Sequence, residues 1–121
     1  RNQLDSIPDV SDLPLLEEFN VSNNRLTELP GDVVNSTRME CLEASKNLLV
    51  QIPENVGGLT RLWKVMLGFN KLTSLPAALF GLPLRTLDVQ SNCLTKISSK
   101  MRECSTLVTL LLSNNQIAHI P

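Results

Sequence analysis

The chain has 121 residues, of which 42% are hydrophobic, and this fits a single globular domain. Only 3% are aromatic, so we expect a core of aliphatic side chains, chiefly leucine. The formal net charge of −1 argues against binding to nucleic acid or to an anionic membrane through bulk electrostatics.

The charge is distributed unevenly along the chain. Residues 1–61 carry five Lys/Arg and ten Asp/Glu, whereas residues 62–121 carry six Lys/Arg and two Asp/Glu. The two halves therefore have formal charges of −5 and +4. This difference is large enough to orient a charged partner along the molecule.

Asparagine recurs at intervals of 22 or 23 residues along the whole chain. These ladder asparagines are Asn2, Asn24, Asn47, Asn70, Asn92 and Asn115. Each has an aliphatic residue two positions later and another three positions beyond that, and proline follows in five of the six copies. A fixed period of this length indicates stacked, similar units.

Three apolar residues precede each ladder asparagine from the second onward, as in Leu62, Val65 and Leu67. The last two are separated by one residue, which is the period of a strand with one buried face. Strands one repeat apart are expected to pair into a parallel sheet, with each coil packing its apolar residues on the next. The five full copies place these strands near residues 18–22, 41–45, 64–68, 86–90 and 109–113.

Each asparagine stands where the chain must turn out of the strand. Its amide is both donor and acceptor, so it can satisfy backbone groups that the turn leaves unpaired. The return segment to the next strand is too short for more than a turn or two of helix or 3₁₀-helix. Its expected buried residues are Val33, Val34, Val56, Leu59, Leu79, Leu82, Met101 and Cys104. In the first return segment Ser36 replaces a leucine, so we expect weaker anchoring there.

The pattern L-x-x-L-x-L-x-x-N-x-L-x-x-L-P resembles that of the leucine-rich repeat family over essentially the whole chain. The resemblance implies an α/β solenoid, a curved right-handed coil with a parallel β-sheet on its concave face. Short helical, 3₁₀ or extended segments are then expected on the convex face. Both ends fall inside a repeat and no capping repeat is visible, so we expect residues 1–121 to be about five repeats of a longer array.

The 23-residue step and the Leu-Pro sequence resemble the intracellular subclass of this family, found in Ras-pathway scaffolds and in erbin- and scribble-like polarity proteins. The resemblance implies binding of a protein partner on the concave sheet, within a larger signalling or scaffold protein. We therefore expect a protein partner, with no nucleic acid, no membrane insertion and no small-molecule ligand.

Little in the sequence points to catalysis. The only histidine, His119, has no sequence sign of a nucleophile or a metal partner. The three cysteines, Cys41, Cys93 and Cys104, lack the spacing of a zinc site or a disulfide framework, and Cys104 occupies a core position. We expect no enzymatic activity, no catalytic residue, no metal site and no cofactor.

Four glutamates, Glu17, Glu18, Glu40 and Glu43, form an acidic cluster on adjacent predicted strands. A metal-binding or acid–base role is one interpretation. We favour an interaction surface, because no proton donor or set of metal ligands accompanies the carboxylates.

The odd number of cysteines favours a reducing compartment, so we expect an intracellular, cytoplasmic location. Two Asn-x-Ser/Thr sequons keep another interpretation open, the recognition region of an extracellular receptor or surface antigen. Asn20 lies within a predicted strand and is the poorer acceptor, whereas Asn35 lies on a return segment. A regulatory repeat region of a larger enzyme is a third interpretation.

Positions that alternate with buried residues along each strand should point to the exposed face of the sheet. From these positions and those beside them we select ten candidate partner-binding residues. They are Glu18, Glu40, Glu43, Trp63, Lys64, Met66, Phe69, Arg85, Asp88 and Leu111.

The third strand is the most unusual, because Trp63, Met66 and Phe69 lie around Lys64. We expect these residues to form an apolar cluster that anchors a partner at the centre of the sheet. The alternative for Trp63 and Phe69 is that they turn inward and fill space at the ends of the strand, while Met66 is expected to be exposed.

Overall fold

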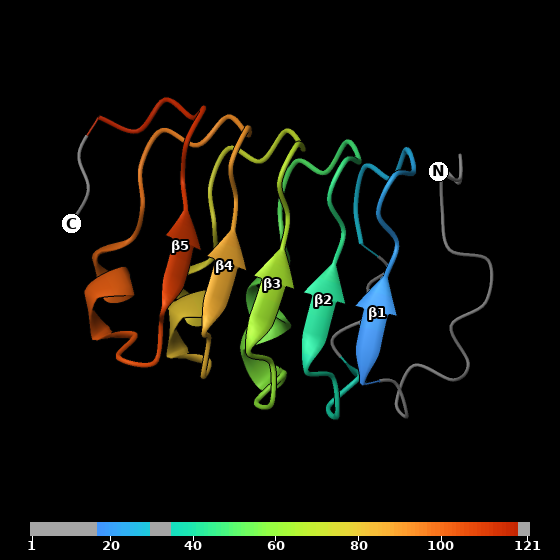
Figure 1. Cartoon of the computed structure of the whole chain (residues 1–121), viewed down its shortest axis with the longest axis vertical. Helices are drawn as coiled ribbons and strands as arrows, with labels where there is room; N and C mark the ends of the chain where they lie inside the picture. The colour runs from blue at the N-terminus through green and yellow to red at the C-terminus, as the bar shows by residue number, and fades with distance from the viewer. Residues whose placement is uncertain (1–16, 30–34, 119–121) are drawn as a thin grey trace.

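The computed structural model of the chain describes residues 17–29 and 35–118, which form five coils around one parallel sheet. The strands follow one another across the sheet in chain order (Figure 1). Their bounds are β1 Glu18–Asn20, β2 Cys41–Glu43, β3 Lys64–Met66, β4 Thr86–Asp88 and β5 Thr109–Leu111. The expected curved α/β solenoid is confirmed. The copy that contains Asn2, and the residues Val33, Val34 and His119, lie outside the described residues.

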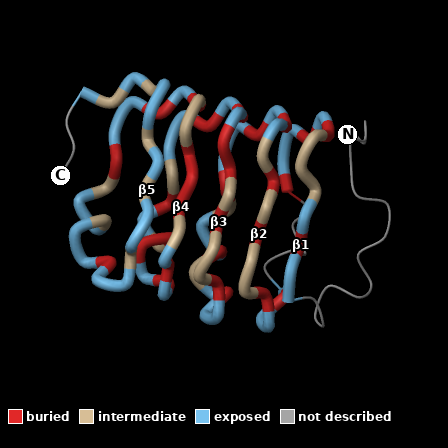
Figure 2. Tube along the Cα trace, in the orientation of Figure 1, coloured by how far each residue is buried: buried red, intermediate tan, exposed pale blue. Residues whose placement is uncertain are grey.

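The strands pair in a register of one repeat, so equivalent residues lie side by side. Leu42 pairs with Val65, and Val65 pairs with Leu87. These three central residues are almost completely buried, because the intervening positions take the opposite face of the pleated sheet. Burial is densest between β2 and β4 and falls at β5 (Figure 2).

The hydrogen-bonded surface is longer than the three residues of each strand. Before β3, the backbone N–H of Trp63 donates to the carbonyl of Glu40 at 3.0 Å. After β3, the N–H of Phe69 donates to the carbonyl of Gln90 at 3.0 Å. The sheet-like surface of this coil therefore extends over residues 63–69, from Trp63 to Phe69.

The ladder asparagines hold the coils together, as Asn70 shows. Its Nδ2 donates to the carbonyl of Leu67 in its own coil at 2.9 Å and to that of Ala44 in the preceding coil at 3.0 Å. Its Oδ1 accepts from the backbone N–H groups of Asn47 and Leu49, each at 3.1 Å. The carboxamide therefore closes its own turn and joins two coils. Asn47, Asn92 and Asn115 also donate to a carbonyl of their own coil and to one of the preceding coil, and each accepts from one backbone N–H of the preceding coil.

Three of the return segments contain short 3₁₀-helices on the convex side, as expected. The described helices are η3 Glu54–Gly58, η4 Ala77–Gly81 and η5 Ser99–Glu103. Within residues 17–29 and 35–118, none of the helices is long and apolar enough to cross a bilayer. The expected core residues of these segments are buried, except for Met101, which is half-buried.

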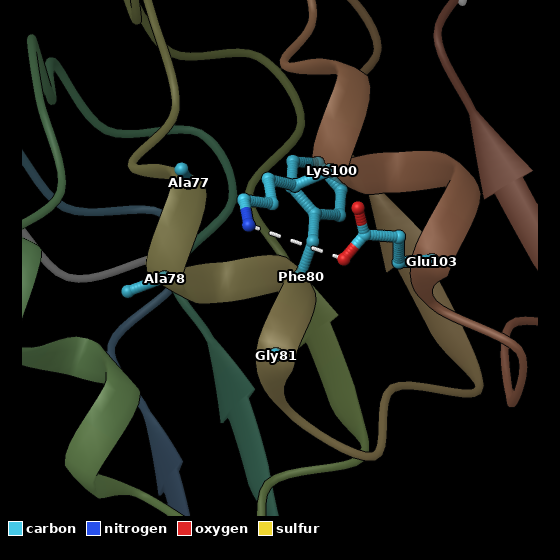
Figure 3. Close-up of a pocket in the computed structure, with 6 residues that line it drawn as sticks. All are labelled: Ala77, Ala78, Phe80, Gly81, Lys100 and Glu103. Carbon is cyan, nitrogen blue, oxygen red and sulfur yellow. Dashed lines mark ion pairs between the residues drawn. The ribbon is translucent and has the colours of Figure 1, made fainter.

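Two side chains of the convex layer differ from a simple leucine pattern. Phe80, which the repeat pattern does not select, is only 3% exposed. It lines a hollow of about 280 Å³ between η4 and η5, where Lys100 and Glu103 form an ion pair at 4.0 Å (Figure 3). Ser36 is fully buried and its hydroxyl has no hydrogen-bond partner among the described residues. A buried unpaired hydroxyl carries a free-energy cost, in the direction expected for that segment.

The asparagine ladder gives a direct test of what stabilises the coils. Replacing Asn70 by Ala leaves the buried N–H groups of Asn47 and Leu49 without acceptors. We expect the free energy of unfolding to fall by about 3 kcal/mol. The matched control is Asn115→Ala, because Asn115 is half-buried and accepts from one N–H group, that of Leu94. There we expect a loss of about 1 kcal/mol in urea titrations followed by circular dichroism. Equal losses in the two variants would contradict this account.

Candidate functional site

The face of the sheet that points away from η3–η5 carries side chains that differ from repeat to repeat. No other described element covers this face (Figure 1). Equivalent positions form rows across the five strands, because neighbouring strands pair in a register of one repeat. We call this face the concave face, and the ten candidate residues were selected as positions on it or beside it.

The acidic candidates gather at β1 and β2. Glu18 is exposed, and Glu40 and Glu43 are half-buried. Glu43 lies 4.0 Å from the Nζ of Lys64 on β3, so the acidic surface meets a cation at the next strand. Among the described residues, no group of three His, Cys, Asp or Glu side chains is arranged to hold a metal ion.

The expectation that Asp88 faces solvent is wrong. Its side chain is only 6% exposed, because Gln90 folds over it. The two oxygens of the carboxylate accept from the backbone N–H and the Nε2 of Gln90, each at 3.1 Å. Gly68 leaves the room for this arrangement, since a Cβ added there would lie 3.3 Å from Asp88 Oδ1. Asp88 shapes the surface and does not present an open charge.

Trp63 and Phe69 do not form one apolar cluster. They lie at opposite ends of the extended β3 surface, six residues apart, which corresponds to roughly 20 Å along a strand. Met66 lies between them and is half-buried. Trp63 is also half-buried and lines a groove with Arg85. The expected single anchor is therefore replaced by two separate apolar positions, one at each edge of the sheet.

Phe69 points outward and not into the core. Its side chain is 49% exposed, and the Nζ of Lys46 lies 6.0 Å from the centre of its ring. The interpretation that Phe69 fills space inside the coil is therefore wrong. The position before the ladder asparagine is exposed or half-buried, and never buried, in the five described coils.

The backbone at this position has a positive φ in each described coil. The residues are Asn23, Lys46, Phe69, Ser91 and Asn114, with φ between 55° and 63°. Asparagine tolerates this left-handed conformation better than most residues, whereas a bulky side chain is an outlier there. The conformation costs roughly 1–2 kcal/mol for an ordinary L-residue, and Phe69 offsets little of this by packing because it is half-exposed.

Several exposed residues at this surface were not selected from the sequence. Arg61, Pro83 and Thr106 line the groove that contains Trp63 and Arg85. These three residues occupy the same position in successive repeats, two residues before Trp63, Arg85 and Val108. Aligning the repeats at this position could have identified them from the sequence. Leu111 on β5, which was selected, is 40% exposed.

Cys41 is half-buried in the acidic part of the concave face. Burial raises the pKa of its thiol above the ordinary value of 9.0, and the negative charge of Glu18 raises this pKa further. The cation of Lys64 opposes the shift. Glu43 and Glu40 raise the pKa as well. Each cause acts on the thiolate, which burial and negative charge destabilise and positive charge stabilises.

The raised pKa predicts slow alkylation of Cys41 near neutral pH, because the thiolate is the reacting species. In a variant with Cys93→Ser and Cys104→Ala, the iodoacetamide rate should rise with pH to a midpoint above 9.0. Glu18→Gln should lower that midpoint, whereas Lys64→Met should raise it. A midpoint at or below 9.0 in the parent, or shifts of the same sign in both variants, would refute this explanation.

Comparison with solved structures finds close likeness over most of the chain. A leucine-rich repeat protein of Leptospira interrogans matches with a TM-score of 0.91 and 30% identity, covering 98% of this chain and 31% of that protein. The plant peptide hormone receptor RGFR1, in complex with RGF2, matches with a TM-score of 0.84 and 26% identity, and the match covers 97% of this chain and 20% of that receptor. YopM from Yersinia enterocolitica WA-314 matches with a TM-score of 0.79 and 29% identity, and the match covers 100% of this chain and 24% of YopM. The chain thus spans about a third or less of each of these proteins.

Sequence comparison gives the same family. No curated protein sequence matches the chain significantly. Two family models described as leucine rich repeat match residues 60–117 and 15–36, which together make up more than half of the chain. With the asparagine ladder and the parallel sheet, these matches show that the chain belongs to the leucine-rich repeat family.

Proposed function

We propose that the chain recognises a protein partner on the concave face formed by β1–β5. The leucine-rich repeat fold generally mediates protein–protein interaction, and the similar receptor RGFR1 is seen in complex with RGF2. The concave face carries a different set of side chains in each coil, while the buried positions keep one pattern. The variation of these side chains across an uncovered face of the sheet supports recognition there.

Phe69 is the observation that carries this proposal. A bulky side chain at a φ of 61° is strained, and half of that side chain is exposed to solvent. Three of the other four coils have Asn or Ser at this position. A residue that costs stability and contributes little to packing points to a role outside the fold.

The charges of the concave face support a definite orientation of the partner. β1 and β2 present Glu18, Glu40 and Glu43, while the later coils present Arg85. A partner with the opposite order of charges would be oriented as it approaches. Met66, between these regions, is a flexible side chain that adapts to an apolar contact.

The proposal includes an intracellular, cytoplasmic setting within a larger signalling or scaffold protein. All three cysteines are free thiols, which suits a reducing compartment. The 23-residue step and the Leu-Pro sequence resemble the erbin- and scribble-like subclass.

Phe69→Asn separates recognition from folding. Relief of the backbone strain should exceed the loss of the Lys46 contact, raising the free energy of unfolding by about 0.5–1 kcal/mol. Partner capture should nevertheless weaken. Capture is measured by placing a photo-cross-linking amino acid at Met66 on the concave face, in cells that express the chain.

Glu43→Lys and Glu54→Lys form a matched pair for the same measurement. Both change a glutamate to a lysine, but Glu43 lies on the concave face and Glu54 in η3 on the convex side. We expect cross-linking from Met66 to be lost only with Glu43→Lys. No cross-linking from Met66 in the parent chain, or an equal loss with Glu54→Lys, would contradict binding on the concave face, whereas capture that survives both Phe69→Asn and Glu43→Lys would show that these two residues do not carry it.

An extracellular receptor or surface antigen is the second candidate, and one observation favours it. Asn35, in an Asn-Ser-Thr sequon, is exposed in the structure. Asn20 also is exposed, but it lies in β1, and its Oδ1 accepts from the N–H of Ser22.

Expression through a secretory pathway tests this second candidate. If it holds, the secreted chain should carry a glycan that is lost with Asn35→Gln and kept with Asn20→Gln, as measured by mass spectrometry. A folded, secreted chain without glycan on Asn35 would count against an extracellular setting.

A further inference from the structure

A groove lies where β3, β4 and β5 begin. The tails of the arrows in Figure 1 mark the starts of these strands. The groove's volume of about 500 Å³ is within the range of ligand-binding clefts. Two positions in each of three successive coils line it. These residues are Arg61, Trp63, Pro83, Arg85, Thr106 and Val108.

The groove combines apolar walls with positive charge. Trp63, Pro83 and Val108 supply the apolar surface, and Val108 is 75% exposed. The two charged lining residues are Arg61 and Arg85, and no acidic residue lines the groove. Both arginines are exposed.

The polar groups of the groove differ in whether they already have a partner within the chain. The hydroxyl of Thr106 donates to the carbonyl of Leu84 at 2.7 Å, so it is occupied. Among the described residues, no carboxylate forms an ion pair with Arg61 or Arg85. The only acidic residues after residue 61 are Asp88, which Gln90 covers, and Glu103, which pairs with Lys100. The two guanidinium groups are therefore open to carboxylates from outside this half of the chain.

We propose that this groove binds an acidic segment of a protein partner in which carboxylates flank an apolar side chain. Arg61 and Arg85 pair with the carboxylates, since a guanidinium matches a carboxylate in geometry and charge. The apolar side chain packs against Trp63 and Val108, where an aromatic residue provides a large contact area. The inference rests on the proposed function, because the groove borders the concave face and would receive a further part of the same partner.

The occupant follows from charge and shape together. A nucleic acid would be drawn to a larger set of cations than two arginines. A small inorganic anion would leave the apolar walls uncovered, so the groove fits a peptide segment better than a free anion.

The chain has a single tryptophan, so tryptophan fluorescence comes from Trp63, which lines the groove. The probes are capped peptides of the form Gly-Ser-Asp-X-Glu-Ser-Gly, in which X is Leu, Ile, Val, Met or Phe. We expect a saturable change in Trp63 fluorescence that weakens with added salt. Replacing the two acids by Asn and Gln, or X by Ser, should abolish the change.

Protein variants assign the binding to the two arginines. Arg61→Gln combined with Arg85→Gln should weaken binding by about fivefold or more, since exposed ion pairs contribute modestly. Arg102→Gln, an equivalent change in η5 on the convex side, should leave binding unchanged. Because Arg61 and Arg85 are exposed, both variants should fold, which circular dichroism and thermal unfolding confirm.

Three results would overturn the inference. The first is no fluorescence response to any peptide of the set. The second is an equal response to inorganic phosphate, which would reduce the groove to a general anion site. The third is dimerisation of the chain that the double arginine variant abolishes in sedimentation, which would assign the groove to a second copy. If peptide binding fails while cross-linking from Met66 persists, the groove inference falls and the concave-face proposal stands.

Discussion

The buried carboxamide of the ladder asparagine is the interaction on which the other features of this structure depend. At Asn70 one side chain satisfies carbonyls of its own and the preceding coil and accepts from two N–H groups. These backbone groups are buried where the chain leaves the strand, and the pairing of the strands does not satisfy them. Because the same amide must meet the preceding coil in register, it constrains the repeat to 22 or 23 residues and aligns equivalent residues across the sheet.

This turn also produces the feature that best connects the fold to recognition. Immediately before each described ladder asparagine the chain adopts a positive φ, which carries the next residue inward and directs the preceding side chain to the surface. Asn23 and Asn114 are the expected residues for this geometry, whereas Phe69 is not. The strain at Phe69 is therefore local and tolerated because the asparagine network on both sides over-determines the backbone.

The two edges of the sheet carry different chemistry. Phe69 lies at the edge where the strands end, with Lys46 over its ring. Trp63 lies at the edge where they begin, in the groove with Arg61 and Arg85. The acidic surface of β1 and β2 is a third region. A partner that spans these regions would meet apolar, basic and acidic contacts in a fixed geometry, which favours specificity over affinity from any single contact.

The repeat, the strands, the asparagine ladder and the short 3₁₀-helices could all be predicted from the sequence, because each depends on a local period or on residues a few positions apart. The way in which side chains from adjacent coils meet could not be predicted in this way. Gln90 covers Asp88 because Gly68 leaves space, and the groove combines residues from three coils. Trp63 and Phe69 are close in sequence but far apart in space, because the backbone between them is extended. These features depend on rotamers and on contacts between residues about 22 positions apart, so the repeat pattern identified the recognition surface but not its separate sites.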